Sequence, residues 1–322
     1  MNDRPISFVT RSIFAAAAVL IVSAAAFSQT PNPPTPGTDE IVRQAAAQRL
    51  AYVAEFKNLL SRETKTFQTL AKDGRVKDEK TVVSTFLVYQ LPGDGGRISE
   101  FRSVQSVDGK PVEGAETRTN EFFRTVAKAG TNAQQLAVIQ KESTRFDDGF
   151  VIDGLTLYQA IELDDNLRPA FKFTLRGREN FGGHPVYVID YEQTAATPYI
   201  YTNSKKAPPD DKLSYTFNSG YGNRDVDPRL NGTLYIDAAT YQVRRATRRA
   251  TISPDRSGSR VKVSETDFQY TDSEFGILPP KKIVLTQFRA KSDTEQKESV
   301  VIFDYDKFRH PETDVKVVEE TD

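Results

Sequence analysis

The second half of the chain alternates apolar and polar residues in short runs that turn signals separate. In residues 170–176 (AFKFTLR) every second side chain is apolar, as in a strand with one buried face. Residues 185–191 follow after Gly182-Gly183, which predicts a hairpin. Further strands are predicted at residues 231–236, 243–252, 261–270, 282–288 and 299–308. No long helix separates them, so we expect an antiparallel sheet and not a βαβ fold.

A different period marks the start of the first half, where apolar side chains recur every three to four positions. Thr38 is placed to cap a helix, and the next two residues are acidic, which suits the positive end of its dipole. The predicted apolar stripe of this helix consists of Val42, Ala46, Leu50, Val53, Phe56 and Leu60.

After the helix, strands are predicted at residues 81–90 and 98–107, and two helical pieces within residues 116–145. We therefore expect an α+β protein in which helices pack on one face of a curved antiparallel β-sheet. The pattern leaves open whether the two N-terminal strands join the C-terminal sheet.

The first 28 residues have the three parts of a cleavable export signal. Arg4 and Arg11 lie in a polar segment, an apolar run covers residues 13–22, and small residues follow. The run is shorter than the ~20 residues that cross a bilayer, and an uncleaved anchor is the alternative. We expect an exported protein, periplasmic or extracellular and soluble, with no stable membrane span after processing.

These patterns divide the chain into five parts. They are a signal peptide (1–28), a proline-rich linker (29–38), an N-terminal α+β region (39–148), a C-terminal antiparallel sheet (149–310) and an acidic tail (311–322).

Composition narrows the chemistry. The chain has no cysteine, which excludes disulfides, a lipid-modified cysteine, thiolate catalysis and Cys-based zinc sites. Loss of Arg4, Arg11 and Asp3 with the signal reduces 43 basic and 44 acidic residues to 41 and 43, which gives no support to nucleic-acid binding. Twenty Phe and 13 Tyr without any Trp are typical of a β-rich core.

Two stretches of the predicted sheet carry a resemblance. Residues 175–191, with Gly177, Gly182-Gly183 and the strand VYVIDY, and residues 232–237 (GTLYID) resemble the LolA/LolB/RseB-like lipoprotein-sorting superfamily over roughly residues 165–308. Tyr235 stands where that superfamily commonly has Trp. The whole chain also resembles a group of exported bacterial proteins of unknown function. The superfamily resemblance implies an open half-barrel whose concave, helix-covered face receives acyl chains.

Two sets of residues are candidates for binding. The apolar set, which is expected to line the concave face, is Phe171, Phe173, Tyr187, Ile189, Leu234, Ile236, Phe268 and Leu285. The basic set is Arg244, Arg245, Arg248 and Arg249. Alternation puts Arg244 and Arg248 on one face of a strand and the other two on the opposite face, so at least one pair is exposed. Cross-strand pairing with Glu265 and Asp267 is the ordinary explanation of this set, and contact with an acidic or phosphorylated partner is the alternative.

No catalytic, metal or cofactor site is predicted. The only histidines, His184 and His310, fall in turns, and the acid pairs beginning at Asp147, Asp164 and Asp210 read as loop charge. Residues 223–227 mimic the spacing of a calcium loop but lack its distal glutamate.

The sequence thus favours a non-enzymatic exported protein that carries or senses a lipid, an acyl chain or a lipidated protein in the cell envelope. The alternative is a protein-interaction or envelope-sensor module with a filled core and no small-molecule ligand. The two differ in whether the concave face is open, which sequence alone leaves undecided.

Processing of the signal is directly testable. Small side chains at Ala26 and Ser28 predict cleavage before Gln29, and the alanines at 24–26 are the second candidate site. Intact-mass measurement of the exported protein should give a chain that begins at Gln29. A mass that retains residues 1–28 would contradict cleavage and favour the anchor.

Overall fold

The computed structural model gives one compact unit, Pro36–Asp322. The residues that it describes are 36–57, 59–90, 98–115, 117, 119, 121, 141, 143–147, 155–202, 212–221, 226–253, 259–289 and 295–310. The predicted signal peptide, most of the linker, most of the helical stretch at 116–145, the Asp210 pair, most of the calcium-like loop and the acidic tail lie outside the described residues.

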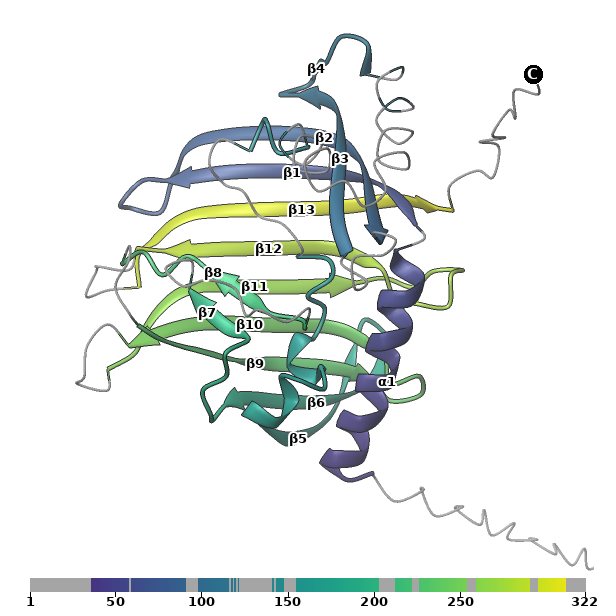
Figure 1. Cartoon of the computed structure of the whole chain (residues 1–322), viewed down its shortest axis with the longest axis vertical. Coiled ribbons are helices and arrows are strands. Elements are labelled where there is room, and N and C mark those ends of the chain that lie inside the picture. Colours follow the sequence, from purple (N-terminus) through teal and green to yellow (C-terminus); the bar gives the residue numbers. More distant parts are fainter. Residues whose placement is uncertain are drawn as a thin grey trace, which may run out of the picture. The chain divides into compact units, whose positions relative to one another are not determined.

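Eleven strands form one antiparallel sheet within the described part of the chain (Figure 1). Its strand order is β4-β3-β2-β1-β13-β12-β11-β10-β9-β6-β5. The strands are β1 (Leu60–Leu70), β2 (Val76–Gln90), β3 (Ile98–Val107), β4 (Lys110–Pro111), β5 (Phe171–Phe181), β6 (His184–Gln193), β9 (Asp227–Asp237), β10 (Val243–Ser253), β11 (Val261–Tyr270), β12 (Pro280–Phe288) and β13 (Lys297–Arg309). The prediction of an α+β protein with a curved antiparallel sheet is confirmed.

The pairing of β1 with β13 joins the two ends of the chain. Through it the N-terminal strands extend the C-terminal sheet, which answers the question that the sequence pattern left open. β1 itself was not predicted, because its inward positions include Ser61, Glu63 and Lys65, so that the strand lacks apolar alternation.

The helix α1 (Thr38–Phe56) crosses the strands near one end of the sheet (Figure 1). Its N-cap is Gly37 and not the predicted Thr38, which lies in the first turn, and its buried face differs from the predicted stripe, whose last member, Leu60, belongs to β1. Leu50 is 61% exposed, and the buried positions are Ile41, Val42, Ala45, Ala46, Arg49, Tyr52 and Phe56. The prediction was wrong at Leu50 because it placed only apolar residues inward, whereas an arginine and a tyrosine take part in this face.

Residues 155–170, called here the cover segment, lie with α1 on the concave face. The segment contains two short 3-10 helices, η1 (Ile161–Leu163) and η2 (Arg168–Ala170). The short parallel pair β7 (Ile200–Thr202) and β8 (Tyr215–Phe217) packs beside it, since the ring of Tyr158 meets that of Tyr215 at 5.3 Å. The hydrophobic core fills the space between this layer and the sheet.

The two motifs that carry the resemblance each form a turn between neighbouring strands of the sheet. Gly182 and Gly183 have φ values of 59° and 88° and form the two-residue turn of the predicted β5–β6 hairpin. Asp237 ends β9: its Oδ1 accepts hydrogen bonds from the backbone N–H of Ala239 and Thr240, both at 2.9 Å. These bonds fix the turn into β10.

Gly232 provides a test of the sheet packing. A Cβ at this position would collide with the backbone oxygen of Thr247 and come 2.7 Å from the hydroxyl of Tyr191. We expect Gly232→Ala to lower the free energy of unfolding by about 1–3 kcal/mol, the usual cost of overpacking. Urea denaturation measures the loss. Gly37→Ala is the control, because a Cβ there meets nothing within 4 Å, and an equal loss in both variants would contradict the packing argument.

Candidate binding site

The apolar candidates lie in the protein interior. Seven of them are at most 8% exposed and belong to the core: Phe171, Tyr187, Ile189, Leu234, Ile236, Phe268 and Leu285. Phe173 is half-buried and packs against that core. In this structure protein atoms cover the concave face, and a role of these residues in ligand contact stays a prediction.

The four candidate arginines separate by face, as alternation requires. Arg245 and Arg249 lie on the outer face and pair with Asp267 and Glu265 at 2.9 and 3.2 Å, so the cross-strand pairing is confirmed. Arg244 is nearly buried, and its Nε donates to Asp237 at 2.6 Å. Arg248 is 2% exposed and points inward. The four do not form one surface patch, and a partner-contact role for them stays a prediction.

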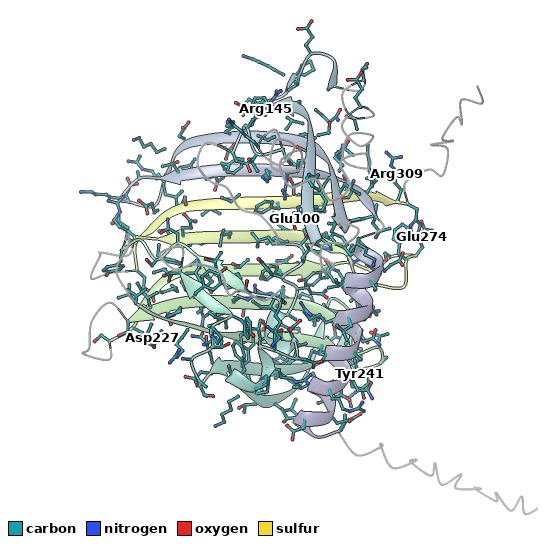
Figure 2. The ribbon with its side chains drawn as sticks, in the orientation of Figure 1. Glu100, Arg145, Asp227, Tyr241, Glu274 and Arg309 are labelled. Atoms are coloured by element: carbon teal, nitrogen blue, oxygen red, sulfur yellow. The ribbon has the colours of Figure 1, made fainter. Side chains whose placement is uncertain are left out.

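The cover segment is fastened by polar contacts on both of its sides. From α1, Arg49 donates to the carbonyl oxygen of Gln159 at 3.0 Å, and the hydroxyl of Tyr52 donates to that of Thr156 at 2.9 Å. From the sheet, Glu100 accepts hydrogen bonds from the backbone N–H and the hydroxyl of Thr156. Glu100 lies over the sheet, whereas Asp227 and Arg309 lie toward the ends of strands (Figure 2).

A first group of buried charges, called here the edge cluster, connects β1 with β3. It consists of Glu63, Lys65, Glu100, Arg102 and Asp147, each at most 2% exposed. Arg102 binds Glu63 through two hydrogen bonds, Nε to Oε1 at 2.7 Å and Nη2 to Oε2 at 3.1 Å. Lys65 donates to Asp147 at 2.7 Å.

Burial and the neighbouring charges shift the pKa values of three residues in the edge cluster. Burial alone raises the pKa of Glu63, but the charges of Arg102 and Lys65 outweigh it and hold that pKa below its ordinary value. Burial and the nearby Arg102 lower the pKa of Lys65. Burial likewise raises the pKa of Asp147.

A second group, called here the cover cluster, connects the cover segment with α1 and β10. It consists of Arg49, Glu162, Asp164 and Arg248. Arg49 binds Asp164 at 2.8 Å, and Arg248 donates through Nη2 to Glu162 at 3.2 Å and to the carbonyl oxygen of Tyr158 at 2.7 Å. Burial raises the pKa of Glu162 despite both arginines.

Sequence reasoning missed most of both clusters, although one signal was present. Arg248 stands at an inward position between Ala246 and Ala250, which are each 1% exposed. A long charged side chain between two alanines on the buried face of a strand indicates an interior charge, because the small neighbours leave it room. The pattern does not reveal its partner, which is 86 residues away in the chain.

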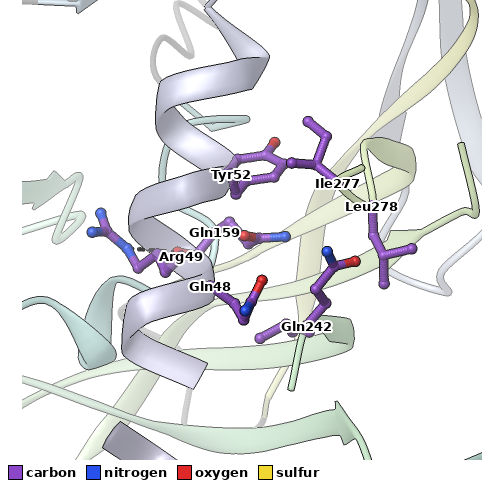
Figure 3. Close-up of a pocket in the computed structure, with 8 residues that line it drawn as sticks. Gln48, Arg49, Tyr52, Gln159, Gln242, Ile277 and Leu278 are labelled. Carbon is purple, nitrogen blue, oxygen red and sulfur yellow. Dashed lines mark hydrogen bonds between the residues drawn. The ribbon is translucent and has the colours of Figure 1, made fainter. Parts of the chain in front are cut away.

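A small pocket lies where α1, the cover segment and the sheet meet (Figure 3). Its lining consists of Gln48, Arg49 and Tyr52 of α1, Gln159 of the cover segment, Gln242, Val243, Ile277 and Leu278. The cavity volume is about 10 Å³, enough for one water molecule. This pocket therefore has no room for an acyl chain in the conformation described.

Each of the two histidines lies near a carboxylate. Nε2 of His184 is 3.5 Å from Asp272, and Nε2 of His310 is 3.6 Å from Glu55. Among the described residues, no group of three or more metal-ligating side chains is arranged to hold a metal ion. In the same part of the chain, no helix is long and apolar enough to cross a membrane.

Several solved structures are similar to this chain. A domain named for outer membrane lipoprotein sorting, from Vibrio parahaemolyticus, has 10% identity and a TM-score of 0.40, covering 86% of this chain and 94% of that one. A DUF1329 family protein from Desulfovibrio piger has 12% identity and a TM-score of 0.34, covering 88% and 95%. A LolA superfamily protein from Nitrosomonas europaea has 11% identity and a TM-score of 0.29, covering 86% and 94%.

No family model and no curated protein matches the chain. The resemblance to the lipoprotein-sorting superfamily that the sequence predicts is thus found again among solved structures. At TM-scores below 0.5 it carries no argument about function, which has to be argued from the residues of this chain.

The edge cluster predicts that loss of the buried Arg102 destabilises the protein far more than loss of the surface residue Arg249. Arg102→Met leaves Glu63 and Glu100 buried without their main partner, and we expect the free energy of unfolding to fall by about 3–5 kcal/mol. Arg249→Met is the matched control: its side chain is 52% exposed and pairs with Glu265 at the surface, so the expected loss is below about 1 kcal/mol. Urea denaturation of both variants checks this, and equal losses would refute the structural role of the cluster.

Proposed function

We propose that this protein binds an amphiphile, a lipid, a fatty acid or the acyl chain of a lipidated protein, between the concave face of the sheet and the layer formed by α1 and the cover segment. The activity is binding and release without a chemical step. The cell envelope is the proposed place of action, in keeping with the predicted export signal.

One observation carries the proposal: the apolar part of the concave face is covered by a short, irregular segment that is held by polar atoms. Phe268, Ile189 and Leu234 are fully buried beneath this layer. Each such side chain gains about 1.5–3 kcal/mol from burial, and an acyl chain satisfies that preference as well as protein does. Replacing the cover by an acyl chain therefore keeps the face dry.

The cover segment also has features of a part that can be displaced. Ala160, at the start of η1, has a φ of 43°, a left-handed conformation that costs an alanine about 1–2 kcal/mol. The polar contacts of Arg49 and Tyr52 adjoin the pocket, where water can replace them. Because the pocket holds about one water molecule, binding requires the layer to move away from the sheet.

A filled core without a ligand is the second candidate, and the closed concave face favours it. Under this alternative the protein is an interaction module, and the buried charges serve only to fix the fold. The two candidates differ in whether the interior accepts an apolar molecule.

Uptake of palmitic acid tests the proposal. The processed protein should bind it, as measured by native mass spectrometry and by displacement of a fluorescent fatty acid. The chain has no cysteine, so Gln48→Cys with Gln242→Cys introduces one reactive pair across the pocket. Bridging the pair with a short bismaleimide should slow uptake at least about tenfold, since α1 is then tied to the sheet.

The same double variant treated with N-ethylmaleimide is the control, because it carries the same substitutions without a bridge and should take up ligand at the wild-type rate. Absence of binding to the unbridged protein would overturn the proposal in favour of the interaction module. Unchanged uptake by the bridged protein would overturn access beneath α1.

A further inference from the structure

Arg248 is bound incompletely for a buried arginine. Its Nη2 makes both of its hydrogen bonds, to Tyr158 and Glu162. Its Nε and Nη1 form no hydrogen bond of good geometry within the part of the chain that the structure describes, where the hydroxyls of Tyr191 and Tyr215 interact with the guanidinium. A buried donor without a well-formed hydrogen bond costs up to about 1–3 kcal/mol, so the guanidinium has unused capacity to bind an anion.

Arg102 is a buried arginine of the same protein that pairs with a carboxylate through two hydrogen bonds. Its Nε and Nη2 form a side-on fork that binds both oxygens of Glu63. Such bidentate pairing is the strongest way in which a guanidinium holds a carboxylate. Arg248 contacts only one oxygen of Glu162, at 3.2 Å, and the other oxygen, Oε1, is also without a partner among the described residues.

The geometry of the guanidinium defines what can complete it. A carboxylate binds two nitrogens at once, either Nε with Nη2 or Nη1 with Nη2. Both forks need an Nη2 hydrogen, and the cover segment holds the two through Glu162 and the carbonyl oxygen of Tyr158. A second carboxylate can therefore engage Arg248 bidentately only by displacing one of these two contacts.

The surroundings of Arg248 suit the head group of an amphiphile. The rings of Phe268 and Tyr215 lie 4.9 and 5.2 Å from its guanidinium carbon. The hydroxyl of Tyr270 lies in the same buried environment and interacts with Gln159 of the cover segment. Tyr270 adjoins Tyr52 of the pocket, with ring centroids 6.3 Å apart. This ring contact connects the pocket, through Tyr52 and Tyr270, with the surroundings of Arg248.

We propose that Arg248 is the anchor for the carboxylate of a single-chain fatty acid, and that Glu162 of the cover segment occupies this anchor when no ligand is bound. The inference rests on the proposed function and adds to it the chemical class of the ligand and its orientation, with the head group innermost. Arg248 is a binding residue, and Glu162 is a competitor built into the chain.

The exchange keeps the interior charge balanced. The ligand carboxylate replaces that of Glu162 beside Arg248, and Glu162 leaves with the cover segment. Arg49, Tyr191, Tyr215 and Tyr270 are the other titratable groups that face Glu162. Arg49 keeps its own partner, Asp164. Burial raises the pKa of Glu162, and a ligand carboxylate in the same place meets the same burial.

Palmitic acid and its methyl ester distinguish this inference from the proposed function. The two share an acyl chain, but only the acid has a carboxylate. We expect the wild-type protein to bind the acid at least about tenfold more tightly than the ester. Glu162→Gln should strengthen the binding of both ligands by about tenfold, because it weakens a closed state that both must open, and the preference for the acid should persist.

Two variants are the controls. Glu265→Gln changes the partner of the surface residue Arg249 and should alter neither affinity. Arg248→Lys keeps the charge without the fork, and should reduce the preference for the acid while ester binding persists. Retained ester binding shows that the lysine variant is folded, and if it does not fold, the acid-to-ester ratio of the wild-type protein decides.

Each outcome bears on one of the two ideas. If neither ligand binds, the proposed function fails. If acid and ester bind equally to the wild-type protein and to Glu162→Gln, the amphiphile site stands and the carboxylate anchor is refuted.

Discussion

A charge buried on the concave face of the sheet needs a partner inside the protein, and this requirement determines how the covering layer is placed. Arg102 and Arg248 project inward from strands on either side of β13 and are each 2% exposed. Water does not reach them, so carboxylates inside the protein must pair with them: Glu100 of the same strand and Glu63 of β1 pair with Arg102, and Glu162 of the cover segment pairs with Arg248. Arg49 on α1 is a buried charge on the covering side, and it pairs with Asp164.

Ion pairs and hydrogen bonds determine the position of a segment more precisely than apolar contacts do. An apolar side chain accepts any apolar neighbour, whereas Thr156 and Glu162 each have one acceptor or donor to reach, Glu100 and Arg248 respectively. With α1 bound to the same segment through Tyr52 and Arg49, sheet, helix and cover form one connected polar framework. The apolar core fills the space around it, so that a short irregular segment can cover a sheet face that would otherwise need a long helix.

The sequence predicted the parts of this fold that depend on local pattern. β3 and β11 begin and end at the predicted residues, and the Arg245–Asp267 and Arg249–Glu265 pairs follow from a hairpin whose strands are adjacent in the chain. β1 was missed because charges take its inward positions. The interior pairs were missed for a different reason: Arg49 and Asp164 are 115 residues apart, and only the packing of α1 against the cover segment brings them together. No local period carries that information.

The same framework limits how the protein can open. If the cover segment moves away, every charge that it leaves behind needs a new partner. Arg49 lines the pocket, so water can reach it. Arg248 is buried beside Phe268 and the tyrosines. A guanidinium there without a carboxylate partner would cost several kcal/mol relative to the paired state. An apolar ligand alone leaves that charge unpaired, whereas an anionic one supplies the missing carboxylate in the same step. Under the proposed function, the open form would therefore be stabilised most by a molecule that is apolar along its length and negative at its inner end.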